Sequence, residues 1–125
     1  MKIVDANIIL RYFLDDDEEL SPKAAEIIEQ NNLTIPNEVF AEIVYVLEKV
    51  YKIERKEISN TLIEFLYYEN VNSYDLELIK TALDLYARRS LDFVDTILYS
   101  YKEVKNYEIF TFDKKLSNLL NNKNL

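Results

Sequence analysis

Short apolar segments alternate along this chain with longer segments of helical periodicity, and this alternation constrains the fold most strongly. The spacing predicts strands at residues 2–5, at 33–35, around Val71 and at 108–112, the last of them central in its sheet. It predicts helices at residues 7–14, 21–30, 37–51, 55–68, 75–89, 91–105 and 114–121. Strands separated by helices favour an α/β fold, in which a central, mostly parallel sheet of four or five short strands is flanked by helices in three α/β/α layers. Because no linker, repeat or low-complexity segment interrupts the pattern, we expect a single domain over residues 1–125.

The expected helix starts and turns depend on Ser, Pro and Asn, because the chain has no glycine. Ser21 is expected to cap a helix that has Pro22 at its first position. Pro36 is expected to end the second strand, and Asn37 to cap the helix that follows. Without glycine, left-handed backbone at helix ends falls to asparagine, and the candidates are Asn31, Asn32, Asn70 and Asn106.

The absence of three residue types narrows the chemistry of any site. The chain has no cysteine and no histidine, which excludes disulfides, thiolate nucleophiles, imidazole bases and metals ligated by Cys or His. The lack of glycine excludes a glycine-rich phosphate loop. Acid–base or metal chemistry must then come mainly from carboxylates, and all-oxygen sites suit Mg²⁺ or Mn²⁺.

The charge of the chain bears on its partners. The formal net charge is −8 and the pI about 4.6, which on its face argues against nucleic acid and favours a basic protein partner. No apolar run approaches the length of a membrane span, and the N-terminus does not have the pattern of a signal peptide. We therefore expect a cytoplasmic protein that does not enter a membrane.

Four carboxylates lie in apolar surroundings, whereas most acidic residues lie in polar runs. They are Asp5 in KIVDANIIL, Glu42 in VFAEIVYVL, Asp95 in FVDTIL and Asp113 in IFTFD. Asp5 and Asp113 end expected strands, and open α/β sheets bind ligands outside the carboxyl ends of their strands. Two like charges about 4 Å apart repel by roughly 4 kcal/mol at an effective dielectric near 20. A cluster of all four must therefore bind a cation, take up protons or be more widely spaced.

Three of these carboxylates also have a structural interpretation. Asp5 can cap the helix that begins near Asn7, and Asp113 can cap the last helix. Glu42 can be an edge residue that reaches water. The apolar surroundings of Glu42 and the strand-end positions of Asp5 and Asp113 favour a functional interpretation for all three.

The segment LDFVDTILYS carries two aspartates on one helical face. If Ser90 is the N-cap, Asp92 lies in the first helical turn, where a carboxylate interacts favourably with the helix dipole. If Asp92 is itself the N-cap, Asp95 is the third helical residue in an arrangement like a capping box. A structural role is preferred for Asp92, and for Asp95 the two interpretations are evenly balanced.

Further polar and basic residues are candidate supporting groups. Asn7 lies two residues after Asp5. Thr111 lies two residues before Asp113, and either side chain can hydrogen-bond a metal-bound water, although a turn or strand role is equally open. Phosphate contacts can come from the basic residues Arg11, Arg88, Arg89, Lys102, Lys114 and Lys115.

Four stretches of the sequence, taken in order, resemble those of a known family. MKIVDANIILRYFL, EVFAEIVYVLEK, LDFVDTILYS and IFTFDKKL are similar to the PIN-domain ribonucleases, in particular the VapC-like toxins of prokaryotic toxin–antitoxin pairs. The resemblance implies a PIN-like fold and catalytic, metal-binding roles for Asp5, Glu42, Asp95 and Asp113, which would hold one or two Mg²⁺ or Mn²⁺ ions. It gives auxiliary positions to Asp92 and Thr111. The implied reaction is hydrolysis of an RNA phosphodiester by metal-activated water.

The same resemblance implies partners. These are an RNA substrate, a small antitoxin that inserts a segment into the acidic cleft, and a second copy in a homodimer. The strongly acidic charge departs from what a general nuclease needs, and it suits selective cleavage of a structured RNA or a partner with a basic arm. The main alternative is a catalytically silent PIN-like domain that binds protein or RNA. A haloacid-dehalogenase-type phosphatase would need a second Asp where this chain has Asn7, and no receiver-type set of acidic residues and lysine is evident.

Overall fold

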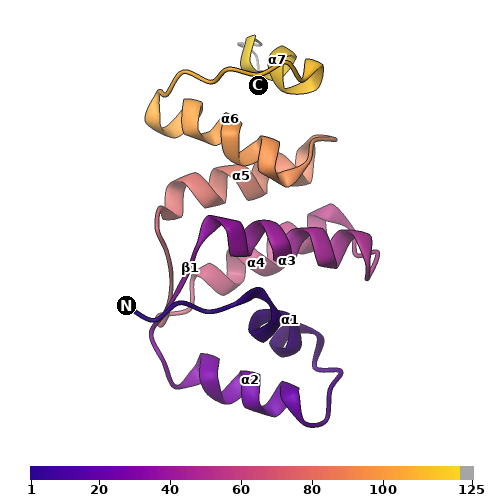
Figure 1. The fold of residues 1–125 in the computed structure, drawn as a ribbon, viewed down its shortest axis with the longest axis vertical. Coiled ribbons are helices and arrows are strands. Elements are labelled where there is room, and N and C mark those ends of the chain that lie inside the picture. The colour runs from indigo at the N-terminus through magenta and orange to yellow at the C-terminus, as the bar shows by residue number, and fades with distance from the viewer. Residues whose placement is uncertain (122–125) are drawn as a thin grey trace.

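Helices dominate the computed structural model, which describes residues 1–121 (Figure 1). The helices are α1 (Ala6–Leu14), α2 (Leu20–Glu29), α3 (Asn37–Lys49), α4 (Arg55–Leu66), α5 (Leu76–Arg88), α6 (Phe93–Lys105) and α7 (Lys114–Asn121), and the strands are β1 (Leu33–Ile35) and β2 (Val71–Ser73). Every helix expected from periodicity is confirmed, with ends that differ by a few residues. The last four positions of the expected domain, 122–125, lie outside the described residues.

The sheet is parallel and small. β1 and β2 pair with Leu33 opposite Val71. Ile3 adds a parallel bridge to Thr34, whose amide donates to the carbonyl of Lys2 at 2.8 Å. The α/β class and the parallel pairing are therefore confirmed, but across residues 1–121 the sheet has two strands and this bridge, not the four or five strands expected.

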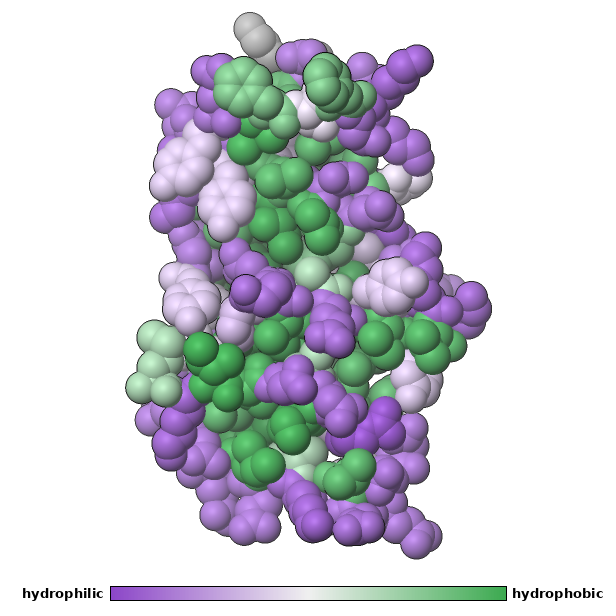
Figure 2. Space-filling model, viewed as in Figure 1, coloured by the Kyte–Doolittle hydropathy of each residue, from purple (hydrophilic) through white to green (hydrophobic). Residues whose placement is uncertain are grey.

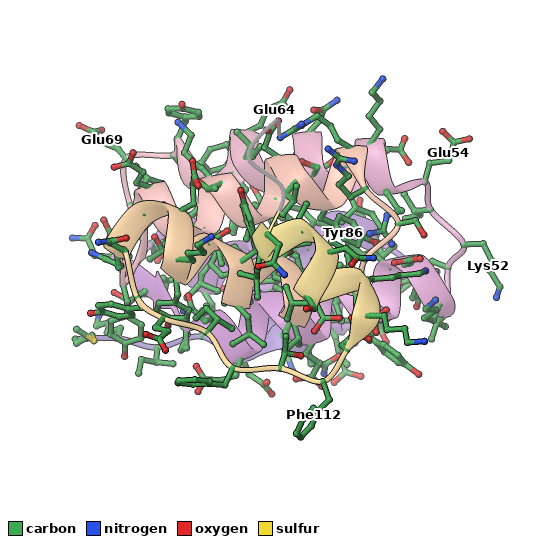
Figure 3. All side chains as sticks on the ribbon, turned by 90° about the horizontal axis from the view of Figure 1, so that it is seen from above. Lys52, Glu54, Glu64, Glu69, Tyr86 and Phe112 are labelled. Carbon is green, nitrogen blue, oxygen red and sulfur yellow. The ribbon has the colours of Figure 1, made fainter. Side chains whose placement is uncertain are left out.

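The expected strand at residues 108–112 is not formed. In Figure 1 this segment connects α6 to α7 at one end of the molecule, away from β1. Phe110 and Phe112 are 86% and 107% exposed, and Figure 3 shows Phe112 pointing away from the body of the molecule. An alternating apolar pattern favours a strand only where a neighbouring strand is available to pair with it. Here Asn106 ends α6 in a left-handed conformation (φ 59°) and leads the chain toward α7 instead.

The small sheet changes how the helices pack. Figure 1 shows the helices stacked along the long axis, from α2 at one end to α7 at the other. α5 packs against α4 and α6, and α1 against α2, so the helices pack mainly on one another. The expected α/β/α layers require a broad central sheet, and the described sheet is too small to form one.

Two of the expected N-caps are displaced by one or two residues. α2 begins at Leu20, before Ser21, because the Asp17 carboxylate accepts the amides of Glu19 and Leu20 at 2.9 and 2.8 Å. Asn37 is the first residue of α3, and the cap position belongs to Pro36. A short polar residue near a helix start therefore predicts the start but not the capping position itself.

For α6 the sequence left two N-caps open, Ser90 and Asp92, and the choice between them bears on the site. α6 begins at Phe93, so its N-cap is Asp92. At the other end of the same helix, Asn106 has the left-handed backbone predicted for asparagine. The other positive φ angles along the described chain belong to Asp15 and Lys52, which the sequence did not indicate.

The core lies between the helices. The main cluster joins side chains from α1, β1, α3, α4, α5 and α6, with Phe40, Leu83 and Tyr86 among its fully buried members. A smaller cluster holds α7 against α5 and α6 through Leu116 and Leu119. No helix of the described range is long and apolar enough to cross a membrane. The two clusters fix the start of α6 between α3 and α7.

Candidate active site at the start of helix α6

The start of α6 presents two aspartates that capping does not explain. Asp92 has the extended backbone of an N-cap (φ −63°, ψ 148°), yet within residues 1–121 its side chain makes no capping hydrogen bond. Asp95 lies in the first turn and is half-buried. The two hydrogen bonds of a capping box are thus both missing from the described structure. The capping interpretation of Asp95 therefore loses its support.

Electrostatics connect Asp95 to two other carboxylates. Burial raises the pKa of Asp95, and the negative charges of Asp113 and Asp92 raise it further. Repulsion of this kind is felt only between groups that lie near each other. The structure therefore brings Asp95, Asp113 and Asp92 into one electrostatic cluster at this end of the molecule.

Asp113 has a structural role that is visible in its contacts. Its carboxylate accepts the amide of Leu116 at 2.8 Å, and its carbonyl accepts the amide of Ser117 at 2.9 Å, so it caps α7. Its own amide donates to the hydroxyl of Thr111 at 3.0 Å. Thr111 thus holds the turn that leads into Asp113, which is the turn role that the sequence left open for it.

Neither of the other two predicted carboxylates, Asp5 and Glu42, is among the charges that raise the pKa of Asp95. Asp5 caps α1, accepting the amide of Ala6 at 2.7 Å. Glu42 is exposed on α3, and Asn7 is exposed on α1. Figure 1 shows α1 on the far side of α3 from α7, the helix that Asp113 caps.

A divalent ion suits these residues by chemistry but not by their present arrangement. Carboxylate oxygens are the donors that Mg²⁺ and Mn²⁺ prefer. Nevertheless, in the part of the chain that the structure describes, no three acidic side chains are grouped closely enough to hold a metal ion. Asp5, Glu42, Asp95 and Asp113 do not fit a metal in this conformation.

A cavity of about 470 Å³ opens between α3 and the start of α6. Asp92 and Asp95 line one wall, and Tyr45, Glu48 and Lys49 line the other. The sequence did not single out these three residues of α3. Ala41 also lines the cavity, and Tyr45, Glu48 and Lys49 follow it at helical spacing, so these residues share one face of α3.

Glu48, which lines this cavity, also belongs to a cluster of polar side chains. The hydroxyl of Tyr86 donates to Glu48, and Arg55 contacts the same carboxylate at 3.4 Å. Burial raises the pKa of Glu48, but the Tyr86 hydrogen bond and the charges of Arg55 and Lys49 lower it more, so the net direction is down. Burial and Glu48 together raise the pKa of Tyr86 well above its ordinary value. Tyr86 lies in the interior of the molecule (Figure 3).

The predicted basic residues are mostly engaged in contacts within the chain. Arg11 pairs with Asp16 at 2.7 Å, and Arg88 pairs with Asp84 at 3.1 Å. Two lysines donate hydrogen bonds to backbone carbonyls: Lys102 to that of Leu120 at 2.6 Å, and Lys115 to that of Ser90 at 3.3 Å. Arg89 and Lys114 are exposed.

Comparison with known proteins identifies the family. The PIN domain family matches residues 2–120, a range that contains all four predicted carboxylates. The chain belongs to the PIN domain family. This PIN domain is 30% identical over 125 residues to a protein of Aquifex aeolicus (strain VF5) named VapC ribonuclease, with 95% of this chain and 92% of that protein covered. The family resemblance found in the four sequence stretches is confirmed.

Proposed function

We propose that this PIN domain protein is a divalent-metal-dependent endoribonuclease and the toxin of a toxin–antitoxin pair, with residues 1–125 acting as one domain. The relative named VapC ribonuclease supports the activity. The structural observation that carries the proposal is Asp95, a half-buried carboxylate beside the cavity at the start of α6. Its pKa is raised by burial and by Asp113 and Asp92, a combination typical of functional sites.

The proposed catalytic residues are carboxylates, because the chain has no histidine or cysteine. They are Asp5, Glu42, Asp95 and Asp113, supported by Asp92, Asn7 and Thr111. Hydrolysis joins a water oxygen to phosphorus and breaks the bond from phosphorus to the leaving ribose oxygen. The proton that the water loses needs an acceptor, and the leaving ribose oxygen must take one up. With no histidine in the chain, a carboxylate of this set that does not hold the metal would pass the proton to the leaving oxygen or to solvent.

We propose Mg²⁺ or Mn²⁺, as one or two ions, from the donor chemistry of these side chains. Because the four carboxylates are not grouped in the described conformation, the proposal requires a rearrangement. The segment that must move is residues 106–113, since it alone connects Asp113 to α6. After this movement the sheet would have one more strand, which brings it closer to the four or five strands predicted from the sequence.

The free edge of the sheet supports this rearrangement. Because Thr34 donates to the carbonyl of Lys2, the amide and carbonyl of Ile3 point away from β1, toward the open edge. Ile3 is 58% exposed, so a strand added there would bury it. Residues 108–112 make no backbone hydrogen bond to the rest of residues 1–121, and they expose Phe110 and Phe112. Parallel pairing of the two segments would bring Asp5 and Asp113 to the same end of the sheet.

The proposed partners follow from the surface. Figure 2 shows apolar surface along the middle of one face, bordered by polar residues, and such a patch is typical of an interaction site. We propose that an antitoxin with a basic segment covers this face, since the chain carries a net charge of −8, and that the toxin forms a homodimer. Arg89 and Lys114 are the proposed first contacts with RNA phosphates, because they are exposed and not paired in the described residues.

One observation favours a second function. The carboxylates are not grouped for a metal in residues 1–121, which is what a catalytically silent PIN domain would show. Such a protein would bind RNA or a protein partner through the same apolar face and would hydrolyse nothing.

A cleavage assay separates the two functions. Purified protein, freed of antitoxin by refolding, is incubated with mixed RNAs in Mg²⁺ or Mn²⁺ and in EDTA. We expect cleavage by the wild type with metal, none in EDTA, and loss of cleavage in Asp5→Asn and Asp95→Asn. Glu64→Gln, an exposed carboxylate on α4, is the matched control and should cleave normally. Cleavage that survives EDTA and both substitutions would refute the metal mechanism, and the absence of any cleavage would favour the binding function.

A further inference from the structure

Arg55, at the start of α4, makes more side-chain contacts than any catalytic candidate. Its Nε donates to the carbonyl of Tyr86 at 2.9 Å. Its Nη2 donates to the carbonyl of Arg89 at 2.9 Å and also to that of Leu91. Its Nη1 contacts both oxygens of Glu48 at 3.4 Å. The guanidinium also lies 3.8 Å from the centre of the Tyr86 ring.

These contacts converge on one short connection. The carbonyl of Tyr86 belongs to the last turn of α5, where backbone carbonyls have no partner within the helix. The carbonyls of Arg89 and Leu91 lie in residues 89–92, which link α5 to α6. A cation at the C-terminal end of a helix also interacts favourably with its dipole. Arg55 therefore holds both the end of α5 and the connection that follows it.

The connection determines where the two aspartates of α6 stand. Asp92 follows Leu91 directly, and Asp95 lies one turn further on. Neither side chain has a hydrogen bond inside the described chain that could orient it, so the position of each depends on the backbone. Arg55 holds this backbone by two of its hydrogen bonds, and Lys115 adds a longer one to the carbonyl of Ser90 at 3.3 Å.

We propose that Arg55 is a positioning residue of the ribonuclease site, acting through the 89–92 connection on Asp92 and Asp95. This inference rests on the proposed function. Only arginine suits the role, because its planar fork donates in several fixed directions at once, whereas lysine offers one flexible ammonium. Glu48 and the Tyr86 ring hold the guanidinium from the other side, so the fork cannot turn away from the carbonyls.

The test compares Arg55→Lys with two matched controls. Arg55→Lys keeps the positive charge beside Glu48 but loses the fork. Ser59→Ala removes another hydrogen bond from α4 to α5, that of the buried Ser59 hydroxyl to the carbonyl of Leu83 at 2.8 Å, and leaves the connection untouched. Lys56→Ala removes a positive charge from the next, exposed position of α4.

Two readouts are measured on the full chain: the kinetics of RNA cleavage, and hydrogen exchange at the amides of residues 90–95. In Arg55→Lys we expect kcat to fall by about tenfold or more, as for a misplaced reacting group, with KM unchanged and faster exchange at residues 90–95. Both controls should stay within about twofold of the wild type in kcat and in exchange at these amides.

Three results would overturn the role of Arg55. They are an Arg55→Lys kcat like that of the wild type, an equal loss in Ser59→Ala, or unchanged exchange at residues 90–95. If the wild type cleaves no RNA, the proposed function fails separately, and the exchange comparison alone then decides whether Arg55 fixes the connection.

Discussion

Replacing Tyr86 by phenylalanine should lower the free energy of unfolding by about 1.5–2 kcal/mol at pH 7. The substitution removes one hydroxyl from a fully buried side chain and leaves its ring under Arg55 and against Phe93. Hydrogen bonds to charged groups contribute about 1.5–3 kcal/mol each. The lower part of that range applies because the Glu48 side chain is 23% exposed and keeps Arg55 at 3.4 Å and Lys49 at 3.5 Å.

The loss should also depend on pH. The pKa of Glu48 is lowered in the folded protein, despite its burial, by the hydroxyl of Tyr86 and by Arg55 and Lys49. A lowered carboxyl pKa contributes stability that is present above the ordinary pKa and is lost as the pH falls through the folded value. The difference between Tyr86→Phe and the wild type should therefore be full at pH 7 and shrink below about pH 4.

Urea unfolding followed by circular dichroism, at pH 7 and at about pH 3.5, measures both effects. Tyr99→Phe is the matched control, because its hydroxyl donates to the exposed Glu103 at 3.4 Å and should contribute less than about 0.5 kcal/mol. A loss in Tyr86→Phe no larger than in the control would refute the reasoning. So would a loss of the same size at both pH values.

Three further results are expected. Asp95→Asn should leave the metal-free protein at least as stable as the wild type at pH 7, because the raised pKa of Asp95 means that its ionised form destabilises the folded state. This gain in stability should vanish below about pH 3.5, where Asp95 is protonated, and a lower unfolding midpoint of Asp95→Asn at pH 7 would restore a structural role for Asp95. Asp113→Ala should lose about 0.5–2 kcal/mol with the cap of α7, whereas Asp113→Asn should keep the cap and still abolish cleavage; an active Asp113→Asn would remove Asp113 from the site. A Lys2→Cys/Phe110→Cys variant of this cysteine-free chain should form a disulfide under mild oxidation if residues 108–112 pair beside residues 2–5. If no disulfide forms, with or without metal, the proposed movement of residues 106–113 is contradicted.

Local patterns predicted most of the elements. The helices and the strand at 33–35 were found because periodicity and flanking Pro and Asn are local signals. The strand predicted at 108–112 does not form, because an alternating pattern becomes a strand only beside a free edge, and this segment lies away from β1 in the described fold. The caps expected at Ser21 and Asn37 were off by two positions and one position. The Asp17 carboxylate accepts the amides at the start of α2, and Pro36 takes the cap position of α3 without a side-chain hydrogen bond.

The candidate site stays a prediction. Asp95 was singled out by its apolar surroundings with a capping role equally open, and in the structure burial and the charges of Asp113 and Asp92 raise its pKa. The cluster of Glu48, Arg55 and Tyr86 could not be predicted, since its contacts join residues 7 to 38 positions apart that share no motif. Such contacts depend on how α3, α4 and α5 pack, and no single segment of sequence carries that information.

Mn²⁺ titration followed by NMR of the side-chain carboxyl carbons tests the central claim most directly, because the ion broadens only the carboxylates that lie near it. About one or two equivalents of Mn²⁺ should broaden Asp5, Glu42, Asp95 and Asp113 together, before any other carboxylate and without RNA present. Broadening confined to Asp92, Asp95 and Asp113, or spread evenly over the surface carboxylates, would show that the four residues do not form one metal site.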